Sequence, residues 1–192
     1  ALCEVKKKIY NVIVLDLNLS DVSGMDNVRA IIQEDPELPI VVLSSHNNDK
    51  MALDAVRSGA QEYLVKGHSD GRVLGLALMS SIERKAHERR LFRQANYDEV
   101  TGLPNQRMFM DYLQHWIIRA QRWKRTESVM FIELHDFKKV SEQMGQELSN
   151  EFLKHATIRL KMALRASDVL ARFNGGEFAV HLDTAAQTSV EL

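Results

Sequence analysis

The sequence predicts two units of different fold class, an α/β unit followed by an α+β unit, joined by a helical stalk. In the first third of the chain, short apolar runs alternate with helical patterns, which is typical of a parallel sheet with helices on its faces. A long and highly charged helical pattern then runs over residues 69–94. In the last quarter, two apolar runs flank Asn174-Gly175-Gly176, which predicts an antiparallel hairpin.

The first unit contains three strand-like runs, each followed by a polar residue. We expect strands at Val12–Leu15, Ile40–Leu43 and Tyr63–Val65, and helices at Met25–Gln33 and Lys50–Ser58. The polar residues at the strand ends are Asp16, Ser44 and Lys66. Because ligands of parallel sheets bind beyond the carboxyl ends of the strands, we expect these three side chains to face one crevice.

The charged helical pattern that follows is apolar on one side in its first half only. Its second half, 83–93, consists largely of Arg, Lys, Glu and His, which favours a solvated or dimeric helix over a nucleic-acid contact. Because no Pro- or Ser-rich linker interrupts it, we expect a stiff stalk through which the chain forms a homodimer. The expected boundaries are 1–84 for the first unit, 85–97 for the linker and 98–192 for the second unit.

The second unit combines helices with a small antiparallel sheet. The expected elements are a helix over 108–120, a strand at Val129–Leu134, helices at Phe137–Gln143 and 148–164, and hairpin strands at Val169–Phe173 and Phe178–Leu182. Gly145 is expected to end the shorter of the two later helices.

The composition is that of an ordinary globular protein, with 45% hydrophobic and 27% charged residues. With 25 basic and 26 acidic residues, the net charge of −1 predicts no overall attraction to nucleic acid or anionic lipid. The single cysteine, Cys3, cannot form an internal disulfide and fits a reducing, cytoplasmic compartment. We expect no membrane span, because no apolar run has the required length.

The three strand ends have the chemistry of a phosphate-accepting site. A carboxylate can attack phosphorus to form an acyl phosphate, helped by a cation such as Mg²⁺, a hydroxyl and an ammonium group. The runs 12–26 and 59–67 resemble two-component receiver domains. That resemblance implies a flavodoxin-like fold, a cognate histidine kinase as phosphodonor, and Asp16 as phosphoacceptor and Mg²⁺ ligand.

The same resemblance assigns four further residues. Asn18 would lend a backbone carbonyl to Mg²⁺, Ser44 and Lys66 would bind the phosphoryl group, and Tyr63 would be the aromatic switch residue. The family also has an acidic metal-binding pair on a first strand that this sequence does not show. We therefore expect the receiver to lack its first strands, to leave an apolar edge at Val12–Leu15 unpaired, and to accept phosphate from acetyl phosphate poorly. A longer form that contains the first strand should be labelled at Asp16.

The hairpin resembles the signature of the GGDEF family of diguanylate cyclases, which join two GTP molecules into cyclic di-GMP. Aligned from Arg172, the signature residues are Asn174, Gly175, Gly176, Glu177 and Phe178. The third position of the family is an acidic metal ligand, and here it is Gly176. The resemblance implies a nucleotide-cyclase-like fold, of which we expect the C-terminal part to be missing, and an impaired catalytic site.

The run 133–142 resembles a second motif of that family. By analogy, Glu133 and the carbonyl of Leu134 would bind Mg²⁺, Phe137 and Lys138 would cradle phosphates, and Ser141 and Asn150 occupy guanine-reading positions. Arg165 and Asp168 match an Arg-x-x-Asp site through which related proteins bind cyclic di-GMP. A capping or solubilising role for this Arg and Asp is the alternative.

Three functions remain open at this stage. The first is a phosphorylation-controlled response regulator of cyclic di-GMP signalling, with an impaired GGDEF domain acting as a regulatory or ligand-binding module, in a parent that could continue into an EAL domain. The second is an active cyclase that uses Glu133 and Glu177 in altered geometry. The third is a cyclic di-GMP receptor that binds through Arg165 and Asp168.

Overall fold

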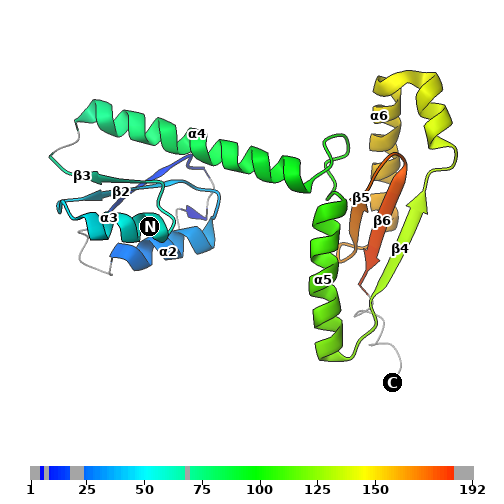
Figure 1. The fold of residues 1–192 in the computed structure, drawn as a ribbon, viewed down its shortest axis with the longest axis horizontal. Coiled ribbons are helices and arrows are strands. Elements are labelled where there is room, and N and C mark those ends of the chain that lie inside the picture. Colours follow the sequence, from blue (N-terminus) through cyan, green and yellow to red (C-terminus); the bar gives the residue numbers. More distant parts are fainter. Residues whose placement is uncertain (1–4, 7–8, 18–23, 68–69, 184–192) are drawn as a thin grey trace. The chain divides into compact units, whose positions relative to one another are not determined.

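The computed structural model describes residues 5–6, 9–17, 24–67 and 70–183 (Figure 1). Asn18, expected to contact Mg²⁺, and Cys3 lie outside these residues. The chain divides into two compact units, Ala1–Leu91 and Phe92–Leu192, and the division falls inside the stretch expected as a linker. Each unit has its own sheet and its own core.

The first unit is a three-stranded parallel sheet with the strand order β1-β2-β3. Its elements are β1 (Ile13–Asp16), α2 (Gly24–Glu34), β2 (Ile40–Ser44), α3 (Asp49–Arg57), β3 (Glu62–Val65) and α4 (Gly71–Asn96). The central strand β2 is almost continuously apolar and nearly fully buried, as strands covered on both faces are. Figure 1 shows α2 and α3 on one face of this sheet and α4 on the other.

The register of the sheet decides which side chains meet at its carboxyl edge. Asp16 on β1 is paired with Leu43, and Ser44 on β2 is paired with Val65 on β3. The last residues of the strands therefore lie at one edge of the sheet. Among the described residues β1 pairs with β2 alone, and the β1 residue Val14 is 42% exposed, so an apolar edge is open there.

Helix α4 is a single helix that continues past the first unit. Its small residues Ala77 and Ser81 are buried, whereas Arg84 donates a hydrogen bond to the carbonyl of Gln61 at 3.0 Å. Further along, Arg89 forms an ion pair with Glu37 at 2.6 Å. These polar contacts tie the middle of the helix to the first unit.

The second unit is an α+β unit whose antiparallel sheet has the order β4-β6-β5. Its elements are α5 (Gln106–Trp123), β4 (Ser128–Glu133), α6 (Phe137–Ala163), β5 (Val169–Arg172) and β6 (Glu177–Leu182). Phe109 of α5 packs with Ala171 and Ala179, whereas Leu153 of α6 packs with Phe178. Because successive strand residues point to opposite faces, the two helices cover opposite faces of the sheet.

Helix α6 is kinked at Gly145, which has φ 77° and ψ 171°. A residue with a Cβ rarely adopts this conformation, and because these angles are not helical, Gly145 separates two helices within α6, as expected. The hydroxyl of Ser149 donates to the carbonyl of Gly145 at 2.7 Å, which ties the turn after the kink to the residue at the kink.

Candidate functional site

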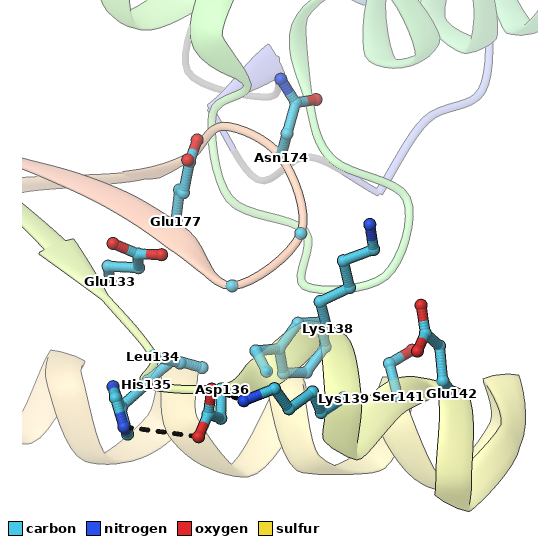
Figure 2. Close-up of a pocket in the computed structure, with 13 residues that line it drawn as sticks. Glu133, Leu134, His135, Asp136, Lys138, Lys139, Ser141, Glu142, Asn174 and Glu177 are labelled. Carbon is cyan, nitrogen blue, oxygen red and sulfur yellow. Dashed lines mark hydrogen bonds and ion pairs between the residues drawn. The ribbon is translucent and has the colours of Figure 1, made fainter.

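A pocket of about 610 Å³ lies where the end of β4, the first turn of α6 and the tip of the hairpin meet (Figure 2). It is lined by Glu133, Leu134, His135, Asp136, Phe137, Lys138, Lys139, Ser141, Glu142, Asn174, Gly175, Gly176 and Glu177. The structure thus brings the hairpin remnant together with most of the second motif. Asn150 is not among the lining residues, and its side chain instead accepts a hydrogen bond from Gln146 at 2.9 Å.

The hairpin tip is shaped by its own backbone. The N–H of Phe173 donates to the carbonyl of Glu177 at 2.9 Å, and the N–H of Glu177 donates to the carbonyl of Asn174 at 2.8 Å. Gly175 has φ +51°, which glycine adopts without the steric penalty of a Cβ. The carbonyl of Gly176 accepts from the N–H of Leu134 at 2.9 Å, so the tip is tied to the loop after β4.

The position of a side chain at residue 176 is already filled. A Cβ built on Gly176 would lie 2.8 Å from Cβ of Phe137, 2.9 Å from its Cγ and 3.1 Å from Cβ of Leu134. These atoms are close to the backbone and cannot move aside by a simple rotamer change. The loop after β4 therefore occupies the space that the family's third signature side chain would need.

Two carboxylates face each other across the strands that enter the pocket. Glu133 on β4 is paired in register with Glu177 on β6, which places their side chains on the same face of the sheet. Both are exposed, and Figure 2 shows both pointing away from Leu134. Like charges directly opposite each other repel, so this pair adds negative potential at the pocket mouth.

Apart from the exposed carboxylate of Glu142, the remaining charged side chains of the pocket are basic or already paired. The ammonium of Lys139 bonds to Asp136 at 3.0 Å, and His135 lies 3.4 Å from the same carboxylate. Lys138 extends toward the hairpin tip in Figure 2. Within the described part of the chain Lys138 has no ion-pair partner, and such an ammonium group suits an anionic ligand such as a phosphate.

The residues of the pocket do not fit the Mg²⁺ site that the resemblance implies. Within the described parts of the chain, no group of three or more His, Cys, Asp or Glu side chains could hold a metal ion. The carbonyl of Leu134 accepts a hydrogen bond from the N–H of Phe137 at 3.2 Å, and residue 176 offers no carboxylate. Mg²⁺ requires near-octahedral oxygen ligation, which Glu133 cannot supply alone.

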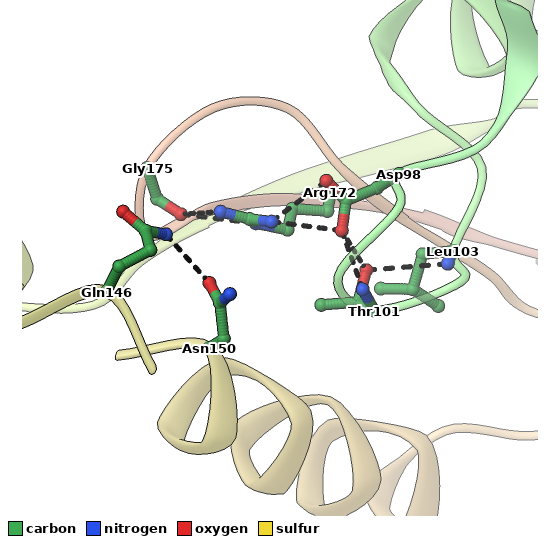
Figure 3. A network of polar contacts seen from close by, with 7 residues as sticks. All are labelled: Asp98, Thr101, Leu103, Gln146, Asn150, Arg172 and Gly175. Carbon is green, nitrogen blue, oxygen red and sulfur yellow. Dashed lines mark hydrogen bonds and ion pairs between the residues drawn. The ribbon is translucent and has the colours of Figure 1, made fainter. Parts of the chain in front are cut away.

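A buried ion pair holds the hairpin tip from its other side (Figure 3). Nη1 of Arg172 donates to both carboxylate oxygens of Asp98, at 2.9 and 2.8 Å, while Nη2 donates to the carbonyl of Gly175 at 2.8 Å. The hydroxyl and backbone N–H of Thr101 also donate to Asp98, at 2.6 and 2.8 Å. Only 10% and 18% of the two charged side chains is exposed.

The network also sets the protonation of the Asp98 carboxyl. Burial raises its pKa, but the hydrogen bonds from Thr101 and the adjacent Arg172 guanidinium outweigh burial, so the pKa lies below its usual value. The sequence analysis assigned no role to Asp98 and did not pair it with Arg172. The one signal available was an arginine on a strand that otherwise carries apolar residues.

The carboxyl edge of the first sheet gathers the polar residues expected there. Lys66 forms an ion pair with Asp16. Ser44 is fully buried, and its hydroxyl accepts from the N–H of His46 at 3.2 Å. The hydroxyl of Tyr63 donates to the carbonyl of His46 at 2.7 Å. Among the described residues, Asp16 is the carboxylate at this edge, and Mg²⁺ would take further oxygen ligands besides it.

Arg165 and Asp168 lie at a second pocket, of about 540 Å³. The carboxylate of Asp168 accepts from the N–H of Arg165 at 2.9 Å and from the N–H of Asp183 at 3.1 Å. Asp168 therefore caps local backbone groups. The guanidinium of Arg165 is exposed and has no ion-pair partner within the described part of the chain.

Comparisons with known proteins identify the class of both units. The family described as "Diguanylate cyclase, GGDEF domain" matches residues 95–191, and the "Response regulator receiver domain" matches residues 1–78. The first match covers more than half of the 192 residues, so the chain belongs to the GGDEF family, with a receiver domain preceding the GGDEF domain. The fold classes expected from the sequence are thereby confirmed.

Individual relatives share parts of this arrangement. The cyclic di-GMP phosphodiesterase PdeR of Escherichia coli is 35% identical over 109 residues, which are 57% of this chain and 16% of PdeR. The response regulator PleD of Caulobacter vibrioides is 23% identical over 192 residues, 95% of this chain and 42% of PleD. The chain thus spans less than half of either relative.

A solved structure of the coiled coil and GGDEF domain of DgcB from Caulobacter crescentus, in complex with c-di-GMP, has the same fold. It gives a TM-score of 0.52 at 19% identity, over 60% of this chain and 62% of that chain. In the described residues, no helix is long and apolar enough to cross a membrane.

Proposed function

We propose that the chain is a response-regulator module of cyclic di-GMP signalling, controlled by phosphorylation of Asp16, with a GGDEF domain that does not turn over GTP. The main support for the proposal is the packing at Gly176, where Phe137 and Leu134 fill the space that the side chain of the missing acid would occupy. The domain would then serve as a regulatory or ligand-binding module. The names of PdeR and PleD, a phosphodiesterase and a response regulator, support the signalling context.

The chemistry of cyclisation explains why this loss is decisive. Two triphosphates must approach each other, and divalent ions normally neutralise their oxygens and the developing charge. This chain keeps Lys138 at the pocket but offers no carboxylate at residue 176. With the metal ligand missing and its space filled, the pocket can hold an anion without providing the charge compensation that the reaction requires.

In the receiver, a carboxylate oxygen of Asp16 would attack the phosphorus of a phosphohistidine or a small phosphodonor. A P–O bond forms, the bond to the leaving group breaks, and the leaving group departs with the electron pair. Lys66, which pairs with Asp16, would shift its ammonium group to the phosphoryl oxygens. The Ser44 hydroxyl would donate to the same group, giving up the bond from His46 that it now accepts.

Tyr63 is placed to respond to phosphorylation of Asp16. Its hydroxyl is bonded to the carbonyl of His46, two residues beyond Ser44. Movement of Ser44 toward a phosphoryl group would displace the 44–46 loop and so free Tyr63 to change rotamer. We further propose a cognate histidine kinase as donor, Mg²⁺ as the receiver's cofactor through Asp16 and Asn18, a dimer through the α4 stalk and a cytoplasmic location.

The first test is turnover of GTP. The chain is incubated with GTP and Mg²⁺, and product is followed by chromatography; we expect no cyclic di-GMP from the native chain or from Gly176→Asp. Steady formation of cyclic di-GMP by the native chain, lost in Glu133→Gln, would overturn the proposal.

The second test is phosphorylation. The chain is incubated with acetyl phosphate or a histidine kinase, and the added phosphoryl group is detected by intact mass; we expect weak phosphorylation. It should disappear in Asp16→Asn but remain in Asp49→Asn, which changes an exposed acid at the start of α3. Label that persists in Asp16→Asn would show that another residue is the acceptor.

One observation favours the active-cyclase alternative. Glu133 and Glu177 are cross-strand partners on one face, so two carboxylates do converge at the pocket mouth, in a geometry unlike that of the signature acid. If they bound metal productively, Glu177→Gln would abolish turnover, whereas Glu151→Gln, at an exposed position on α6 outside the pocket lining, would not. Absence of turnover in the native chain rejects this alternative.

The receptor alternative rests on Arg165, whose exposed guanidinium lies beside a pocket. Calorimetry with cyclic di-GMP tests it, with Arg165→Ala compared with Arg159→Ala, an exposed arginine on α6. Binding that is lost in the first variant alone assigns the receptor role. If calorimetry detects no heat when cyclic di-GMP is added to the native chain, the receptor function is rejected.

A further inference from the structure

The C-terminal end of α5 exposes an unusual combination of apolar and basic side chains, which we call the α5-end patch. Its members are Ile118, Arg119, Arg122, Trp123, Lys124 and Arg125. Ile118 is 65% exposed and Trp123 is 62% exposed. The other tryptophan, Trp116, is on the sheet side of the same helix, where its ring stacks on that of His181 at 3.7 Å.

The members of the patch are neighbours on the helix surface. Residues three and four apart lie side by side on a helix, so Arg119 adjoins both Arg122 and Trp123, and Ile118 adjoins Arg122. Lys124 ends the helix in a left-handed conformation with φ 50°, and the chain turns there. The guanidinium of Arg125 then lies 5.8 Å from the centre of the Trp123 ring. The members of the patch therefore form a chain of neighbours from Ile118 through the two arginines to Trp123, next to the turn that follows the helix.

Its charge is only slightly compensated. Arg119 lies 3.6 Å from Glu127, whose other carboxylate oxygen is 2.7 Å from Nε2 of His181. Within the described residues, Arg122, Lys124 and Arg125 have no carboxylate partner. The chain as a whole carries a net charge of −1, so this is a local concentration of positive charge.

Helix stability explains only part of the patch. Cations near a helix C-terminus interact favourably with the helix dipole, which accounts for a basic residue in the last turn. That interaction gives no reason to expose a tryptophan and an isoleucine beside them. Exposed apolar groups ringed by cations are typical of surfaces that meet an anionic lipid interface, where the indole sits at the headgroup level and the cations contact phosphates.

We propose that the α5-end patch binds the surface of an anionic membrane, with Trp123 and Ile118 inserted among the lipids and the four cations at the headgroups. Charge complementarity identifies the partner, because three cations that have no carboxylate partner among the described residues lie close to the apolar groups. A single-stranded nucleic acid fits less well: base stacking uses aromatic platforms, and an aliphatic side chain such as Ile118 has no such role. The proposal is independent of any activity of the GGDEF pocket.

Vesicle flotation tests the proposal. The 192-residue chain is mixed with phosphatidylcholine vesicles, with or without phosphatidylglycerol, and recovered after centrifugation. We expect association with the anionic vesicles alone, accompanied by a blue shift of tryptophan emission that Trp123→Phe removes. Because each basic residue near a lipid surface contributes a several-fold factor, Arg122→Gln/Lys124→Gln/Arg125→Gln should weaken binding by about 100-fold.

A matched control separates the patch from total charge. The variant Arg107→Gln/Lys154→Gln/Arg159→Gln changes the net charge equally at exposed positions elsewhere in the unit, and it should bind like the native chain. Circular dichroism checks that both triple variants are folded. Equal binding by the two triple variants, equal binding to neutral vesicles, or no binding to either vesicle would each overturn the proposal. Retention on a single-stranded oligonucleotide without vesicle binding would also overturn it.

Discussion

The buried pair of Asp98 and Arg172 makes a sharp prediction about stability. In Asp98→Ala, the Arg172 guanidinium stays in a site where only 10% of its side chain is exposed and keeps the Gly175 carbonyl as its partner. Breaking a fully buried pair destabilises by about 3–5 kcal/mol. Because Asp98 is 18% exposed and one acceptor remains, we expect a loss of about 2–3 kcal/mol in the free energy of unfolding of this unit.

The two tryptophans provide a selective assay. Trp116 and Trp123 both belong to the second unit, so their fluorescence in urea reports the unfolding of this unit alone. A loss of about 2–3 kcal/mol lowers the urea midpoint by about 1–2 M for a domain of this size. The control is Glu99→Gln, which removes the neighbouring exposed carboxylate. If Asp98→Ala unfolds at the same midpoint as Glu99→Gln, the pair does not hold the hairpin.

The pH dependence supplies an independent check. The pKa of Asp98 is lower in the folded chain than in the unfolded chain, so its charged form stabilises the fold at and above neutral pH. That contribution is present above the unfolded pKa of about 4 and is lost as pH falls through the folded value. The stability gap between the native chain and Asp98→Asn should therefore narrow below about pH 4. A gap that stays constant down to the acid unfolding transition would refute the assigned pKa.

Three further predictions concern packing and backbone conformation. Phe109→Ala removes a fully buried ring and should lower stability by about 3–4 kcal/mol in the fluorescence assay; a loss under about 1 kcal/mol would mean that the α5 face of the sheet is loosely packed. Gly145→Ala should lower the free energy of unfolding of the second unit by about 1–3 kcal/mol, because alanine is strained at a positive φ. Gly75→Ala, at an open position on α4, should instead raise the thermal midpoint of the first unit. Equal effects of the two substitutions would contradict the backbone conformation assigned to Gly145. Gly176→Asp should destabilise by about 1–3 kcal/mol through overlap with Phe137, and an unchanged urea midpoint would show that the loop moves aside.

Most of the fold could be predicted from local pattern. The run Ile40–Leu43 is fully apolar and lies between helical patterns, and β2 is the buried centre of a parallel sheet. The break between the later helices at Gly145 could be predicted too, because a glycine can adopt the non-helical, positive-φ backbone that divides α6 there.

The candidate site could be predicted only in part. The absence of the signature acid at Gly176 could be predicted, because it requires only that the hairpin sequence be aligned with the family signature. The filling of its space by Phe137 depends on how the loop after β4 packs, which a linear motif does not reveal. The contact between Asp98 and Arg172 joins residues 74 positions apart, and only the tertiary fold brings them together.

The geometry of the hairpin explains how the fold can persist without the signature acid. The hydrogen bonds described above for the hairpin tip use the backbone of residues 173–177 or the side chain of Arg172, and none of them needs a side chain at residue 176. Stability and catalysis therefore rest on different atoms of the same five residues. Loss of the acid removes the charge compensation needed for chemistry and leaves the Asp98–Arg172 pair and the Leu134–Gly176 bond intact. Once Phe137 packs into the vacated space, that packing itself opposes restoration of the acid, because regaining a carboxylate would first require the loop to open.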